Sequence, residues 1–352
     1  MAVIDASALA LAPEEATSAS EIINERTWND PELSEISAIY TGIQRKAQIV
    51  FAVQMGLVGK TSAGCDPEED DVNIAFTQKY WDPVEIDFKI PHCKDDLPSL
   101  FKAFQRKMKA NESYDLEGEE EMLFIIDRSE TAQKLANLRI SWFSDTAIDN
   151  VANGGVLTNG VAIKYFNPID GHWKQIYAGV TANEINRVTI NENGGANYNA
   201  QLTLGATAAY DYLKSLYNTS DERLKTDENT YIALTPELYD NYAEMIEDKS
   251  LNFSTEYVQK KNGMLAFRGV PLKRISFWGR FIKQYFDNGV TWDKPHRAVM
   301  TVAENVPVAT MDEESMKEFN SWYNKDNRKN YVEGIWTIDA KVLEPYMIAV
   351  AY

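Results

Sequence analysis

The residues GLVGKTSAGC, from Gly56 to Cys65, raise the first chemical question, because a Gly-Lys-Thr triplet ends the loop that binds nucleotide phosphates in many proteins. That loop needs another glycine five residues before the glycine of the triplet, so that successive backbone N–H groups can surround the phosphates. Gln54 occupies this position, and no GxGxxG dinucleotide pattern occurs elsewhere. The sequence therefore argues against a nucleotide site.

The usual nucleophiles and metal ligands are few and badly spaced for chemistry. His92, His172 and His296 are scattered and form no HExxH or other metal-ligand pattern. No GxSxG nucleophile elbow is present, and the adjacency of Cys93 to His92 does not by itself make a nucleophile and a base. We expect structural roles for the three histidines.

One acidic run, DPEEDD at residues 66–71, could in principle hold a hard cation. It lacks the alternating ligand positions and the turn glycine of a calcium loop, so a solvated loop is the better interpretation. The abundant aromatic residues fall on periodic faces and are explained by core and interface packing. We therefore expect no catalytic, cofactor or metal site, and no enzyme.

Composition limits the classes of partner. The chain has 352 residues with 44% hydrophobic and 25% charged side chains, as in ordinary globular proteins, and a formal net charge of −18. Such a charge repels nucleic acid and anionic membranes. Two cysteines without a disulfide or zinc spacing, no secretion signal and no apolar run long enough to cross a bilayer indicate a protein made in the cytoplasm.

The N-terminal part predicts two elements without a core of their own. Residues 1–46 have eight acidic side chains against the single Arg26 before residue 40, and their sparse apolar residues could dock elsewhere or leave a loose tail. Two β-prone runs, IVFAVQMGLV and VNIAFTQKYWDPVEIDFKI, flank the polar turn at residues 59–71 and predict a long β-hairpin. A hairpin of this length lies on a core or reaches toward a neighbour.

Helices and strands alternate through the rest of the chain. Apolar spacing predicts a helix from Lys94, a longer one from Leu116 to Phe143, and another from Ala200 to about Tyr217. Strand and turn patterns occupy 156–190, including VAIKYF, KQIYAGV and NRVTI. The strand TYIALT leads into a helix that Thr235 caps and Pro236 begins. Mixed strand and helix follow at 270–300, and YVEGIWTIDAKVLEPYMIAVAY ends the chain as two apolar strands around an acidic turn.

This order of elements resembles the major capsid proteins of tailed bacteriophages, which have the Hong Kong 97 fold. Three stretches also look like that family, especially its branch in phages of Bacteroidetes-type hosts: NPIDGHWKQIYAGV, TYIALTPELYDNYAEMIED and KVLEPYMIAVAY. The resemblance covers nearly the whole chain as an order of elements. It implies an α+β fold and a structural subunit that self-assembles into hexamers and pentamers of an icosahedral head around double-stranded DNA.

The resemblance also implies a division of the chain. Residues 1–46 would be an N-arm reaching under neighbouring subunits, and 47–93 an E-loop hairpin overlapping the adjacent subunit. A P-domain would combine 94–164, with its long spine helix, and 297–352. Residues 165–296 would form the A-domain, whose tips meet around the five-fold and six-fold axes.

Particular residues and partners follow from the same resemblance. Trp28, Tyr40, Lys60 and Trp81 would contribute to assembly, and Lys60 lies on the E-loop, where members of the family that cross-link covalently carry their lysine. Because few residues precede the hairpin, we expect a separate scaffolding protein, together with a portal and decoration proteins. We expect DNA to be enclosed without sequence-specific binding, no membrane, and localisation in the virion.

Three alternatives remain open at the level of sequence. An encapsulin-like compartment shell would share the fold. A cytoplasmic α/β enzyme with an unrecognised site, or a carbohydrate-binding module with exposed aromatic residues, would belong to other classes. Neither of the last two explains the arm and the hairpin.

Overall fold

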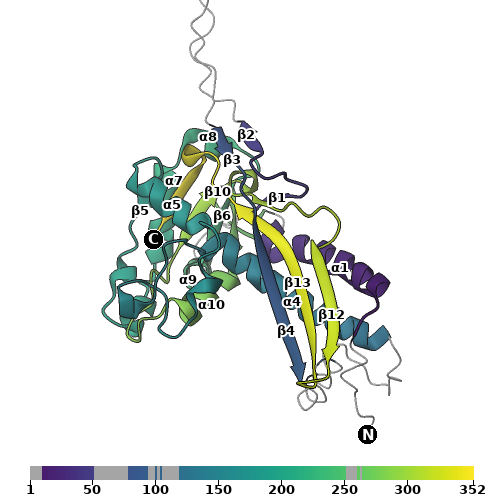
Figure 1. Ribbon diagram of the computed structural model, residues 1–352. Helices are drawn as coiled ribbons and strands as arrows, with labels where there is room; N and C mark the ends of the chain where they lie inside the picture. Colours follow the sequence, from purple (N-terminus) through teal and green to yellow (C-terminus); the bar gives the residue numbers. More distant parts are fainter. Residues whose placement is uncertain are drawn as a thin grey trace, which may run out of the picture.

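The computed structural model describes residues 10–50, 78–93, 100, 104, 119–250, 260–261 and 264–352 (Figure 1). Several predicted features lie outside these residues. They are the GLVGKTSAGC stretch with Lys60 and Cys65, the acidic run at 66–71, and most of the helix expected from Lys94.

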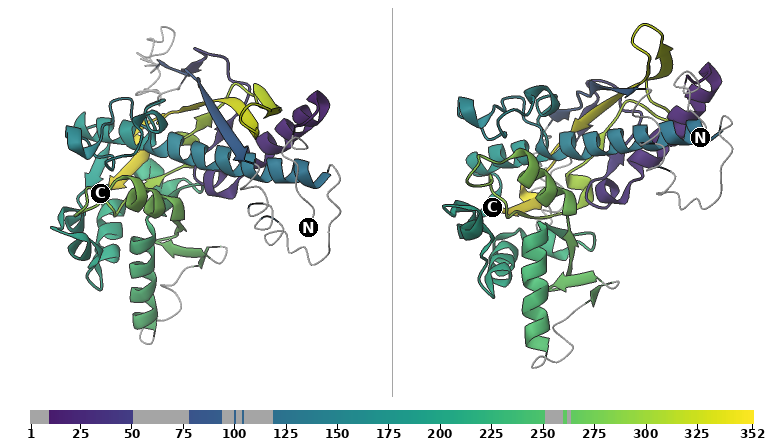
Figure 2. Two further views of the ribbon diagram at one scale, coloured as in Figure 1. Left: turned by 60° about the horizontal axis from the view of Figure 1, so that its bottom comes forward. Right: turned by 90° about the horizontal axis from the view of Figure 1, so that it is seen from below.

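The first sheet carries the longest strands of the described chain. Its strands are β1 (Ile39–Tyr40), β11 (Val308–Ala309), β13 (Lys329–Ala340), β12 (Glu318–Asn324) and β4 (Val84–Cys93). Both β4 and β12 pair antiparallel with β13, and Figure 1 shows these three strands side by side with α1 (Pro13–Trp28) and α4 (Glu119–Phe143). The predicted long helix is thus confirmed as α4, which runs as a long rod in both views of Figure 2.

The second sheet has seven strands, and its central strands are buried on both faces. In order they are β5 (Asn186–Val188), β14 (Ile348–Ala351), β10 (Ala298–Thr301), β6 (Tyr231–Leu234), β9 (Val270–Arg274), β8 (Met264–Phe267) and β7 (Lys260–Lys261). Along β6, Tyr231 and Ala233 face one hydrophobic cluster while Ile232 and Leu234 face the other. Burial on both faces explains why this strand is apolar throughout rather than alternating.

The remaining elements surround these sheets. The other α-helices are α2 (Pro31–Ser34), α5 (His172–Thr181), α6 (Tyr198–Leu202), α7 (Ala208–Thr219), α8 (Glu222–Thr226), α9 (Pro236–Ser250) and α10 (Ser276–Tyr285). Short 3-10 turns are η1 (Val151–Asn153), η2 (Ile163–Tyr165), η3 (Asn191–Gly194), η4 (Ala303–Asn305) and η5 (Pro345–Met347). The predicted strand TYIALT and the proline-started helix after it are confirmed as β6 and α9, although the Thr235 hydroxyl accepts a hydrogen bond from the backbone N–H of Arg297.

The base of the predicted hairpin is present, but its second run divides into two strands. β2 (Gln48–Val50) pairs antiparallel with β3 (Gln78–Tyr80). The alternating residues after Trp81 form β4, which pairs with β13 over ten residues rather than with the first hairpin run. The alternation of Val84, Ile86, Phe88 and Ile90 therefore marks a strand with one face on the core.

Two strand predictions within residues 156–190 are wrong. KQIYAGV, predicted as a strand, lies in helix α5, and VAIKYF contains the 3-10 turn η2. The buried residues of α5, His172, Trp173, Ile176 and Gly179, follow a helical period, which so short an apolar run does not distinguish from a strand. The strand predicted at NRVTI is confirmed as β5.

The helix predicted from Ala200 to Tyr217 is two helices, α6 and α7, separated by residues 203–207. The break is fixed from another element, because Asn241 on α9 donates to the carbonyl of Gly205 and accepts from the N–H of Ala209. Leu202, an apolar residue of the predicted helix, is 40% exposed. Gln201 anchors α6 instead, donating to Asn193 and Trp292 carbonyls and accepting from the N–H of Trp292.

The two predicted C-terminal strands exist, as β13 and β14, but they belong to different sheets. The chain leaves the first sheet after Ala340, passes η5, and enters the second sheet, where β14 is fully buried between β5 and β10. Residues 298–352 therefore contribute strands to both sheets and connect the two halves of the molecule.

Candidate assembly surfaces

The predicted N-terminal arm docks on its own chain. Proline at the first position and Glu14 and Glu15 in the first turn favour the start of α1. Its buried residues Ala16, Ala19, Ile23 and Trp28 join the larger hydrophobic cluster, against α4 and β12. Burial of this stripe against the rest of the chain provides hydrophobic stabilisation. The few apolar residues of the arm could not provide it by packing among themselves.

Polar contacts continue this docking beyond α1. Lys134 on α4 pairs with Asp30 at 2.5 Å and lies 3.6 Å from Glu32. The hydroxyl of Tyr231 donates to the carbonyl of Ile36, and β1 adds in parallel to β11. Residues 13–40 therefore belong to the body of the molecule in this structure.

Of the four residues assigned to assembly, Trp28 is buried within its own subunit. It is 4% exposed, and its indole N–H donates to Oδ1 of Asn24 at 2.9 Å. Lys60 lies outside the described residues.

Tyr40 and Trp81 meet at the base of the hairpin. Their rings lie edge to face with 6.3 Å between centroids, Trp81 is 5% exposed and Tyr40 is 40% exposed. Trp81 exchanges backbone hydrogen bonds with Lys46 and Ala47, which closes the base. The structure thus brings these two predicted residues together, and of the two only Tyr40 is exposed.

The hairpin base is also attached to the end of the first sheet. The Lys79 ammonium donates to the carbonyls of Val342 and Leu343 at 2.6 and 2.7 Å, and partial burial lowers its pKa. The Asp82 N–H donates to a carboxylate oxygen of Asp339 at 2.8 Å. These contacts fix where the hairpin leaves the body.

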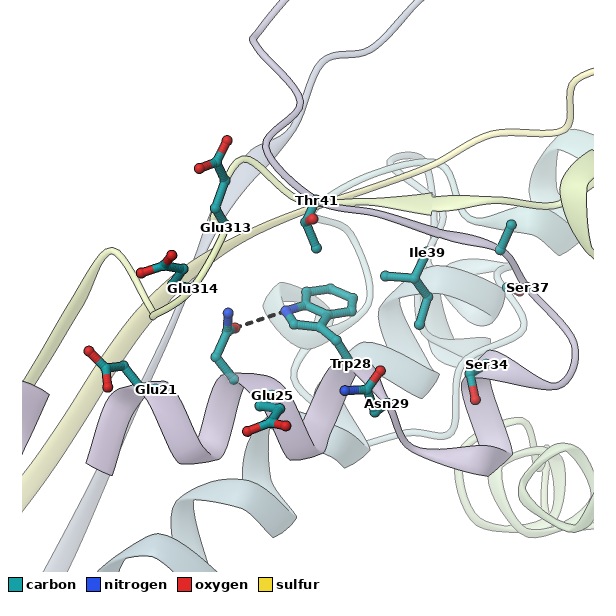
Figure 3. Close-up of a pocket in the computed structure, with 12 residues that line it drawn as sticks. Glu21, Glu25, Trp28, Asn29, Ser34, Ser37, Ile39, Thr41, Glu313 and Glu314 are labelled. Carbon is teal, nitrogen blue, oxygen red and sulfur yellow. Dashed lines mark hydrogen bonds between the residues drawn. The ribbon is translucent and has the colours of Figure 1, made fainter. Parts of the chain in front are cut away.

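An acidic cleft of about 600 Å³ opens between α1, the segment around β1, and the loop before β12 (Figure 3). Its carboxylates are Glu21 and Glu25 from α1 and Glu313 and Glu314 from the loop. Figure 3 shows the Trp28 indole beneath Thr41 and Ile39, with Glu313, Glu314 and Glu21 along one side.

Sequence reasoning missed this cleft. The acidity of residues 1–46 was visible, but nothing local connects α1 with Glu313 and Glu314, almost three hundred residues later. Only the packing of the arm against the start of β12 brings the two acidic pairs together.

The three histidines are all buried, as their expected structural role requires. His172 packs edge to face on Trp142 at 4.7 Å, and His92 packs on Phe124 at 5.5 Å. Burial lowers the pKa of His172 to about 3 and that of His92 to about 4. His296 contacts the carbonyl of Gln201 through Nε2, and burial lowers its pKa as well.

The described residues offer neither a metal-binding cluster nor a membrane-spanning helix. They contain no group of three or more His, Cys, Asp or Glu side chains arranged to hold a metal ion. No helix among them is both long and apolar enough to span a membrane.

No protein-family model matches the chain, and no curated protein sequence matches it. Among solved structures, a chain of the satellite phage P4 procapsid, determined with the size determination (Sid) protein, has a TM-score of 0.52 and 12% identity. That match covers 94% of this chain and 97% of the procapsid chain.

Two further structures are similar at lower TM-scores. The capsid of the empty GTA particle gives 0.47 at 9% identity, covering 91% of this chain and 88% of the other. A virus-like particle from Pyrococcus furiosus gives 0.41 at 9% identity, covering 96% and 98%. These two scores are too low to carry an argument, so the conclusion rests on the P4 procapsid match. At 12% identity that match establishes the fold alone: this chain has the α+β capsid fold of the Hong Kong 97 type.

Proposed function

We propose that this protein is a major capsid protein, a structural subunit that self-assembles into the hexamers and pentamers of an icosahedral phage head. The observation that carries the proposal is the match to the satellite phage P4 procapsid chain, which spans nearly the full length of both chains. In this proposal the protein has no catalytic role. It is made in the host cytoplasm and ends in the virion, around double-stranded DNA.

The division into N-arm (1–46), E-loop (47–93), P-domain (94–164 and 297–352) and A-domain (165–296) is part of the proposal. The long helix α4 against the first sheet supports a P-domain with a spine. The attached base of the β2–β3 hairpin supports an E-loop that leaves the body at a fixed point. The strands β10 and β14 join the second sheet, so the C-terminal segment would link the P-domain to the A-domain.

The partners are also proposed. A separate scaffolding protein would guide assembly, and a portal and decoration proteins would complete the head. The formal charge of −18 favours a shell wall that does not retain DNA by electrostatic attraction. Tyr40, 40% exposed beside the hairpin base, would contact a neighbouring subunit.

Negative-stain electron microscopy of the protein, expressed alone and together with a neighbouring candidate scaffold gene, tests the proposal. We expect closed shells of uniform diameter, tubes or sheets of hexamers in at least one preparation. Isolated globular particles in both, with a monomer peak on gel filtration at high concentration, would contradict it. Shells that enclose a cargo enzyme instead of requiring a scaffold would favour an encapsulin-like compartment.

A further inference from the structure

The acidic cleft has charges that the rest of the described chain does not neutralise. Glu21, Glu25, Glu313 and Glu314 line it, and none of them forms an ion pair within the described residues. Nearby carboxylates are neutralised, since Asp30 and Glu32 contact Lys134 and Glu85 contacts Lys317. Four carboxylates around one cleft repel each other unless a cation lies between them.

A buried polar group on the wall of the same cleft also lacks a partner. Ser37 is 1% exposed, and its hydroxyl has no hydrogen-bond partner among the described residues. Buried polar atoms are normally satisfied, so this hydroxyl indicates an occupant with hydrogen-bonding groups as well as positive charge. A basic peptide segment, with cationic side chains and backbone carbonyls, has both.

The turn between β12 and β13 offers such a segment. Lys325, Arg328 and Lys329 lie within five residues at the end of the hairpin, and none of them has an ion pair within the described residues. Three unpaired cations at one projecting turn are unusual in a chain with 53 acidic and 35 basic residues.

The backbone makes Arg328 a useful position for a test. It has φ of +53°, in the left-handed region that glycine and asparagine occupy at lower cost. Glycine at this position would remove the cation and relieve the backbone at the same time. The turn is otherwise well ordered by hydrogen bonds, from the Asp326 N–H to Asn324 and from Asn327 to the Tyr331 hydroxyl.

We propose that the acidic cleft beside Trp28 receives the basic β12–β13 turn, residues 325–329, of a second copy of this chain. This inference rests on the proposed shell function and names one of its subunit contacts. The occupant is identified by charge complementarity between the four carboxylates of the cleft and the three cations of the turn.

The turn cannot reach the cleft of its own subunit. Glu313 and Glu314 stand just before β12, whereas the turn follows seven residues of strand, about 23 Å further on at about 3.3 Å per residue. β12 pairs with β13 over all seven of its residues, and Figure 1 shows both strands running away from β1. The contact is therefore between subunits.

Reversing the charges of the turn and of the cleft, first separately and then together, tests the contact. Lys325→Glu with Lys329→Glu reverses the turn, and Glu313→Lys with Glu314→Lys reverses part of the cleft. We expect each double variant to lower the yield of shells at least about tenfold, because close opposite charges become like charges. The chain with all four changes should recover most of the yield.

Controls separate this contact from net charge and from misfolding. Lys214→Glu with Arg280→Glu changes the charge by the same amount at two exposed positions without ion pairs, and should assemble normally. Arg328→Gly relieves the left-handed position, so the subunit should be at least as stable while its shell yield falls. Circular dichroism and thermal unfolding establish that each variant is folded.

The outcomes distinguish this inference from the proposed function. If the unaltered chain forms no shells under any condition, the proposed function fails. If it forms shells and the reversed-turn variant forms them equally well, the contact is wrong while the function stands. Failure of the four-change variant to recover, or an equal loss in the Lys214/Arg280 control, would also overturn the contact.

Discussion

His172 stands at the first position of α5 with its ring among the largest aromatic side chains of the core. It is fully buried, it contacts Trp142, and neither ring nitrogen has a hydrogen-bond partner among the described residues. The folded state therefore holds the imidazole neutral, and the pKa falls to about 3 from an ordinary value of 6.5. Protonation must favour the unfolded chain.

The sign of the pH dependence follows. Because the pKa of His172 is lower in the folded state, the contribution of the neutral His172 to the free energy of unfolding is complete above pH 6.5. That contribution is lost as the pH falls toward 3. The loss is on the order of 2 kcal/mol at pH 5 relative to neutral pH. Replacing His172 by Phe should flatten the pH dependence of the unfolding free energy between pH 7 and 5. Urea titrations at several pH values measure the unfolding free energy of both proteins. If it falls as steeply between pH 7 and 5 in the His172→Phe variant as in the unaltered chain, the role given to His172 is wrong.

Alanine substitutions of Trp28 and Tyr40 should differ in their effects on subunit stability and on assembly, although both residues were candidates for assembly. Trp28→Ala removes a side chain that is 4% exposed and should cost about 3–5 kcal/mol of subunit stability. Tyr40→Ala acts on a side chain that is 40% exposed and should change stability by less than about 1 kcal/mol while reducing assembly. Denaturant midpoints of the subunit and shell yields by sedimentation compare the two. Equal effects on subunit stability would refute the distinction.

At the scale of elements, β13 is the strand around which the first sheet is built. Gly334 lies at its middle, opposite Phe88 on β4 and Phe319 on β12. A Cβ at this position would lie 2.7 Å from the Phe88 ring and 2.9 Å from the sulfur of Met316. Glycine thus allows the Phe88 ring to lie directly over the strand.

Gly334→Ala should therefore destabilise the subunit by about 1–3 kcal/mol through overpacking. Phe88→Leu in the same chain should restore part of the loss because it vacates the ring position. Gly205→Ala is the matched control, since the nearest atom to its Cβ would be 4.0 Å away. Thermal unfolding compares the variants. A Gly334→Ala protein as stable as the control would mean that β4 and β13 are not packed as described.

The whole molecule has a formal charge of −18, which determines whether a shell of this protein would attract DNA. We expect no binding to double-stranded DNA even at low ionic strength, because counterion release requires clustered cations. Fluorescence anisotropy of a labelled duplex measures this, with a basic DNA-binding protein as the positive control. Salt-dependent binding would contradict the expectation and indicate a concentrated basic surface.

Some features followed from the sequence because they depend on neighbours in the chain. The period of α4, the proline start of α9, the apolar strand TYIALT that became β6 and the apolar run of β14 are local patterns, and all four elements formed where expected. The order of these elements also sufficed for the resemblance to the capsid fold. Periodicity is reliable for long helices and for fully apolar strands.

Only the tertiary structure decided which partners these elements take. Whether KQIYAGV became a helix depended on the core around Trp142 and Trp278, and the break before α7 depended on Asn241. The pairing of β4 with β13, and the separation of β13 from β14 into two sheets, involve residues up to about 250 positions apart. The acidic cleft likewise joins Glu21 to Glu314. Such contacts leave no local pattern because packing selects them after the elements have formed.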